Sequence, residues 1–202
     1  MKRSQLWKFF LPAAALLCLV LFVSAGGAEK QSRPFSWTLA LQNVKTGELL
    51  PFAAPVKSET GEQFRLMVNP QTACYAYVIA ESANTGDVTV LYAGSLKAGE
   101  TWSSGVLVLS PPKGSESLFI VASLTEQAGL SKMISAFNSS PGVTQRRALM
   151  GEVMRIRGEV SLNKEAPEKP VLMGAASRGS ISGEGVEFSG LDTYVKTISL
   201  EH

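Results

Sequence analysis

Short apolar runs that alternate with turn sequences constrain this chain more than any other feature. Runs rich in Val, Ile, Leu and aromatic residues are separated by KTGE, NPQT and NTGD, which carry typical turn residues. Within several runs apolar and polar residues alternate, as expected for half-buried β-strands. Strands separated by such regular turns predict an antiparallel β-sandwich or barrel.

The predicted strands differ in how deeply they should be buried. The run at 74–80 is apolar on both faces and predicts a central strand. The segment 49–56 contains Pro51 and Pro55, so we expect an irregular or edge segment there. The final run is also apolar on both faces, which indicates that it returns into the first sheet. The predicted strands span residues 37–44, 64–68, 74–80, 88–92, 105–109, 118–123, 185–188 and 193–200.

The pattern changes to a helical one late in the chain. Apolar residues from Leu130 to Phe137 follow a spacing of three and four, and the segment 144–157 carries a second stripe. The members of that stripe are Leu149, Met150, Val153, Met154 and Ile156. We predict a mainly β fold, an antiparallel β-sandwich-like domain over 35–202. Two helices are inserted late, at about 125–158, and a flexible linker rich in Gly and Ser follows at about 163–185.

The first residues have the three parts of an export signal. Lys2, Arg3 and Lys8 precede an apolar run at 9–23, and small residues follow at 24–28. We predict a signal peptide at 1–25, a linker at 26–34 and a periplasmic or secreted protein. Cleavage after Ala28 and an uncleaved inner-membrane anchor remain alternatives. The protein would meet the membrane only if this segment stays uncleaved.

Charge and composition exclude several classes of function. The chain has 19 basic and 17 acidic residues. Without the three basic residues of the leader the net charge is −1, so the sequence shows no excess of positive charge that would indicate nucleic-acid binding. The thiol Cys74 lies on an apolar strand, and the only histidine, His202, lies at what we expect to be a mobile end. Nucleophilic triads and zinc sites need histidines or several cysteines, so we predict no enzyme activity, no metal and no cofactor.

The segment 58–123 resembles the bacterial family called domain of unknown function 4384. The resemblance rests on GEQFRLMV, on CYAYVIAESANTGDVTVLY, on a loop with Gly99 and on LFIVAS before a helix. The closing GLDTYVKTISLEH is also similar to the end of such domains. The resemblance implies an exported or appended β-rich accessory module, and it carries over no catalytic residue.

These observations together predict a non-catalytic, envelope-associated interaction module. Its expected partner is another envelope or secreted protein. The alternative is a domain that binds a small ligand or a glycan on an aromatic platform. The residues of that platform, which also mark the possible partner surface, are Tyr77, Tyr92 and Trp102.

Overall fold

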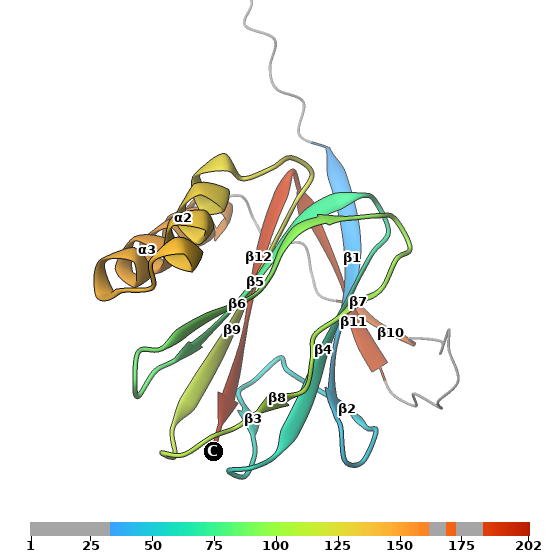
Figure 1. The fold of residues 1–202 in the computed structure, drawn as a ribbon. Helices are drawn as coiled ribbons and strands as arrows, with labels where there is room; N and C mark the ends of the chain where they lie inside the picture. The colour runs from blue at the N-terminus through green and yellow to red at the C-terminus, as the bar shows by residue number, and fades with distance from the viewer. Residues whose placement is uncertain (1–32, 162–168, 173–183) are drawn as a thin grey trace, which may run out of the picture. The chain divides into compact units, whose positions relative to one another are not determined.

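Two β-sheets joined at a corner form the framework of the structure, a computed structural model that describes residues 33–161, 169–172 and 184–202 (Figure 1). The predicted signal peptide, residues 26–32 of the first predicted linker, and residues 163–168 and 173–183 of the second lie outside this part of the chain. The first sheet has the strand order β6-β5-β9-β12, and the second has the order β11-β1-β4-β7. Short strands extend both sheets at their margins.

Strands of eight to ten residues build both sheets, and the remaining strands are shorter. The long strands are β1 (Pro34–Asn43), β4 (Gln63–Pro70), β5 (Cys74–Ser82), β6 (Val88–Leu96), β9 (Ser115–Ser123), β11 (Glu184–Leu191) and β12 (Thr193–Glu201). The short ones are β2 (Leu49–Leu50), β3 (Val56–Lys57), β7 (Trp102–Ser103), β8 (Leu107–Val108) and β10 (Lys169–Leu172).

The corner between the sheets lies at Asp192. This residue has a φ of 59°, which turns the chain between β11 and β12. The two strands share only the pair Leu191–Thr193, so they diverge into different sheets. The Asp192 carboxylate accepts a hydrogen bond from the backbone N–H of Arg33 at 3.1 Å, which ties the start of β1 to the corner.

The alternation in the sequence sets the two faces of the first sheet. One face of β5, β9 and β12 packs on the second sheet through residues such as Val78, Ile120 and Ile198. Aromatic rings from both sheets meet in this core, where the ring centroid of Trp37 on β1 lies 5.7 Å from that of Tyr194 on β12. The predicted β-sandwich is therefore confirmed, and its C-terminal strand pairs with β9 from Thr193 to Glu201.

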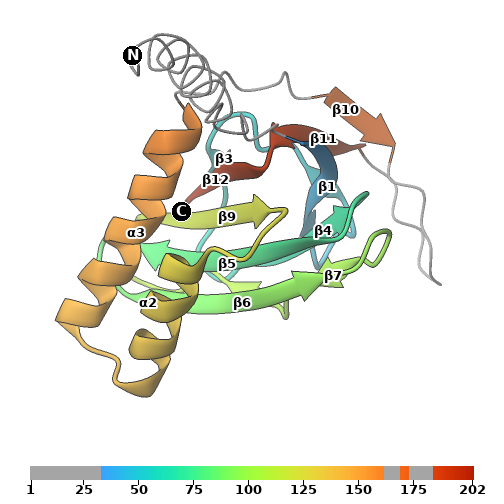
Figure 2. The same ribbon diagram turned by 90° about the horizontal axis from the view of Figure 1, so that it is seen from above.

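The other face of the first sheet is covered by α2 (Ala128–Ser139) and α3 (Val143–Ser161), on the side away from β1 and β4 (Figure 2). Tyr77, Phe119 and Val195 of the sheet join a second core with the helical side chains. The buried helical members are Leu130, Ile134, Phe137, Leu149, Met150, Val153 and Ile156. Met154 does not join them and is 43% exposed, because it projects from the outer face of α3.

Several boundaries differ from the sequence prediction. The strand predicted at 105–109 is reduced to β8, because Ser104 interrupts the ladder with β4. The backbone N–H of Leu66 donates to Oγ of Ser104 at 2.9 Å instead of to a strand carbonyl. Residues 169–172, within the predicted flexible linker, form β10 and pair with β11. Among the described helices, none combines the length and apolar character needed to cross a membrane.

Candidate functional site

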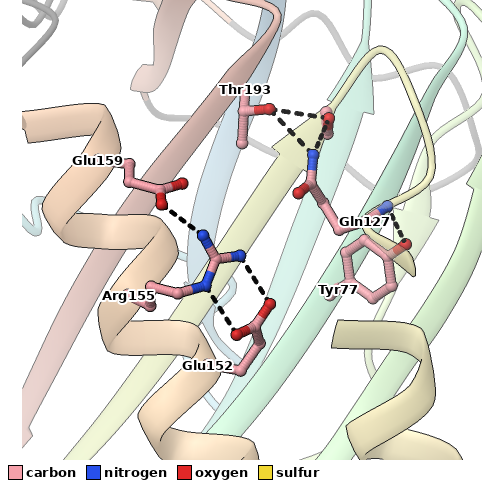
Figure 3. A network of polar contacts seen from close by, with 7 residues as sticks. Tyr77, Gln127, Glu152, Arg155, Glu159 and Thr193 are labelled. Carbon is pink, nitrogen blue, oxygen red and sulfur yellow. Dashed lines mark hydrogen bonds and ion pairs between the residues drawn. The ribbon is translucent and has the colours of Figure 1, made fainter. Parts of the chain in front are cut away.

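Tyr77, one of the predicted platform residues, lies in the helix-facing core. Its side chain is 1% exposed, because odd-numbered residues of β5 point toward α2 and α3. Its hydroxyl accepts a hydrogen bond from the backbone N–H of Gln127 at 3.0 Å and contacts Oγ of Ser131 at 3.1 Å. Tyr77 therefore fixes the start of α2 (Figure 3). Its assignment to a surface platform was wrong.

Tyr92 and Trp102, the other two platform residues, lie together on the opposite face of the first sheet. Their ring centroids are 5.0 Å apart at an angle of 49°. Tyr92 comes from β6 and Trp102 from β7, so the contact bridges the two sheets. The Tyr92 hydroxyl donates to the carbonyl of Ser95 at 2.8 Å. Burial, and then the nearby Glu100 carboxylate, raise the pKa of Tyr92.

A groove of about 460 Å³ opens on the side of the sandwich that carries this pair. We call it the edge groove. Its lining comes from the ends of β5 and β6, from the segment 106–112 that contains β8, and from β9 and β12. Apolar residues such as Leu91, Leu107 and Leu118 line it together with hydroxyl groups and the carboxylates of Asp87 and Glu116.

Two valines of the edge groove are unusually exposed for their type. Val106 is 46% exposed and Val108 is 51% exposed. Val106 directly precedes β8 and Val108 is its last residue. Side chains alternate there, so Leu107 points toward the core and the two valines point outward. The sequence prediction missed both residues. The available signal was the alternation itself, which puts Val106 and Val108 on the face opposite Leu107.

The strand β6 forms the open edge of the first sheet. It pairs with β5 on one side, and among the described residues no strand lies on its other side. The nine residues VTVLYAGSL contain no charged residue and no proline. Its register against β5 shifts at Leu91, which is a β-bulge, and this shift places both Leu91 and Tyr92 against the core between the sheets.

The groups that could act as nucleophiles hold structural positions. Cys74 is buried in the core between the sheets, and burial raises the pKa of its thiol to about 11. Such a thiol is almost entirely protonated at neutral pH, whereas a nucleophile must be a thiolate. Oγ of Ser123 accepts a hydrogen bond from the Gln127 side chain at 2.8 Å and contacts Oγ1 of Thr193 at 2.9 Å, linking β9, β12 and α2. Within the described ranges, no group of three His, Cys, Asp or Glu residues is arranged to hold a metal ion.

His202 is held in place, contrary to the expectation of a mobile end. Its side chain is fully buried, and its Nδ1 lies 3.1 Å from Oγ1 of Thr60. Its backbone N–H and carbonyl pair reciprocally with Gly114 at 2.9 and 2.8 Å. Its Nε2 lies 3.9 Å from the Glu116 carboxylate. The ring thus lies close to the edge groove, because Glu116 lines that groove.

Arginines of α3 are engaged in ion pairs. Arg155 makes two hydrogen bonds to Glu152, at 2.8 and 2.7 Å, and a further ion pair to Glu159 (Figure 3). These bonds lower the pKa of Glu152. Arg146 contacts Oδ1 of Asp87 at 3.1 Å and so ties α3 to the β5–β6 turn. The carboxylates of these ion pairs offset the positive charges of Arg146 and Arg155.

Comparisons with known proteins give no further assignment. The sequence matches no protein-family model, and no curated protein matches it. The resemblance to the domain of unknown function 4384 therefore stays a prediction.

Proposed function

We propose that this protein is an exported, non-catalytic interaction module whose edge groove binds another envelope or secreted protein. One observation carries the proposal: a nine-residue edge strand without charge or proline borders a groove that exposes Val106 and Val108. Exposed, uncharged strand edges invite pairing with another chain, and natural proteins usually protect them. Export rests on the leader sequence, and the accessory role fits the resemblance to the 4384 family.

The absence of catalysis is supported by the positions of the reactive groups. Cys74 is buried with a raised pKa, and the His202 ring is buried against Thr60. A thiol and an imidazole held in separate buried environments lack the contact that activates a nucleophile.

Site-specific photo-crosslinking in intact cells tests the proposed function. A photoreactive side chain at position 108 should give one discrete crosslinked species in the envelope fraction. Position 143 is the matched control, since it is also a valine and is 59% exposed on α3. Equal products from both positions, or no product from position 108, would contradict the proposal.

The second candidate is a small-ligand or glycan site on Tyr92 and Trp102. The contact between the two rings and their partial exposure favour it. Both rings also pack against the core, and the Tyr92 hydroxyl is already bonded to Ser95, so less of each ring is free to bind. Titration with soluble oligosaccharides should change the intrinsic fluorescence of the wild type and not of Trp102→Phe.

A further inference from the structure

The geometry points to an extended peptide segment as the occupant of the edge groove, added to β6 as a new antiparallel strand. The segment places an aliphatic side chain in the groove and a basic side chain beside Asp87 and Glu116. This inference rests on the proposed function and names the chemistry of its partner.

The backbone of β6 supplies the first requirement for strand addition. Its partner β5 uses one edge, so alternate N–H and C=O groups on the other edge lie free of any strand in the described part of the chain. Nine residues span roughly 30 Å at the usual rise of a strand. Recognition by strand addition takes its affinity from such main-chain hydrogen bonds and its specificity from alternate side chains.

The side chains of the edge groove supply the second requirement. Successive side chains of an added strand point to opposite faces, so every second one faces the groove. There Leu91 and Leu107 form an apolar lining, and Val106 and Val108 flank it. An aliphatic, β-branched side chain fits such a half-buried surface. The bulge at Leu91 places Leu91 and Tyr92 on the same face of β6, the one that packs toward the second sheet, and Leu91 lines the groove.

Charge supplies the third requirement and sets the position of the basic residue in the added strand. The charged residues that line the groove are Asp87 and Glu116, and no basic residue of the described chain joins them. Each carboxylate has one neighbouring side chain that can carry positive charge. Arg146 contacts Oδ1 of Asp87, and Nε2 of His202 lies 3.9 Å from the carboxylate of Glu116. Asp87 is nevertheless largely exposed, at 69% of its side chain. A strand antiparallel to β6 ends beside Asp87, so the basic residue belongs at its C-terminal end.

The test uses two synthetic peptides and the full mature chain. The peptide VTVTVTK, capped at both ends, has the proposed character, because its valines and its lysine lie on the same face of a strand. The peptide VTVTVTE differs only in the charge of its last residue. Two-dimensional amide NMR at millimolar peptide should show shifts confined to β6, residues 106–112 and the neighbourhood of Asp87 and Glu116. The dissociation constant for VTVTVTE should be at least tenfold larger than that for VTVTVTK. Val108→Lys should abolish the shifts, whereas Val143→Lys should leave them unchanged.

Each other outcome overturns the inference in a distinct way. No shifts, or shifts on α2 and α3, would exclude strand addition at β6. Equal binding of the two peptides would remove the charge argument. Self-association of the free protein through β6, detected by sedimentation and lost in Val108→Lys, would make a second copy the occupant. The peptide titration and the crosslink at position 108 test different claims. If the peptides fail but the crosslink is seen, the proposed function stands and only strand addition is overturned. If the crosslink is absent, the proposed function is overturned.

Discussion

Removal of residues 193–202 should unfold the protein, because β12 lies between β9 and the corner to the second sheet. Its side chains at Tyr194, Val195, Ile198 and Leu200 are buried, and they belong to both cores. Burial of each such side chain contributes roughly 1.5–3 kcal/mol. Together they contribute about 6–12 kcal/mol, which is comparable to the whole stability of about 5–15 kcal/mol for a domain.

A point substitution makes the same reasoning quantitative in a protein that still folds. Ile198 is 0% exposed, so Ile198→Ala removes buried methyl groups and leaves a cavity. We expect a loss of about 2–5 kcal/mol in the free energy of unfolding. For a chain of this length that corresponds to a fall of roughly 4–20 °C in the melting temperature. Ser199→Ala is the matched control on the same strand, because Ser199 is small and only half-buried.

Thermal and urea unfolding of the three variants, followed by circular dichroism, decides the matter. A truncated protein that stays soluble and melts cooperatively near the wild-type temperature would refute the central role of β12. Equal effects of Ile198→Ala and Ser199→Ala would refute the assignment of Ile198 to the core.

Three further predictions address other parts of the fold. Because burial raises the pKa of the Cys74 thiol from 9.0 to about 11, its protonated form stabilises the folded state. The free energy of unfolding should therefore fall as the pH rises from 9 toward 11 in the wild type, and urea titrations should show less of this fall in Cys74→Ala. Tyr77→Phe leaves the Gln127 N–H without its acceptor and should cost about 1–3 kcal/mol by urea unfolding, with the helical signal retained. Gly86 has a φ of +65°, so Gly86→Ala should cost about 1–2 kcal/mol by the same assay.

The sequence predicted those strands and helices whose pattern of apolar residues lies within the element itself. Alternation located β1 and β4, because a residue's face in a strand depends only on its parity, and short apolar runs located β5, β9 and β12. The three-and-four spacing of Leu130, Ile134 and Phe137 located α2, and all three are buried. The C-terminal strand was predicted from its own apolar character on both faces. Its predicted return into the first sheet is confirmed, since it pairs with β9 and Tyr194 lies opposite Ala122.

The missed features depend on pairing between distant residues. The run CYAYVIA is apolar on both faces, so it could not show that Tyr77 faces helices that follow about fifty residues later. The strand pattern at 105–109 was correct as an alternation, but Ser104 takes the place of a strand partner for Leu66. His202 pairs with Gly114, a contact that no local pattern encodes. The edge groove arises between β6 and β8, and it appears only once both sheets are assembled.

The topology explains why β6 is the edge at which a partner strand can add. At the other side of the first sheet, β12 turns through Asp192 into β11, and β3 covers its far end. The second sheet has only short margins in the described chain: β2, β7 and β8 have two residues each, and β10 has four, including Pro170. Short strands and proline are the usual protection of sheet edges. Among the long strands that the structure describes, β6 is the one whose outer side is unpaired over its whole length, and the exposed valines of the edge groove lie beside it.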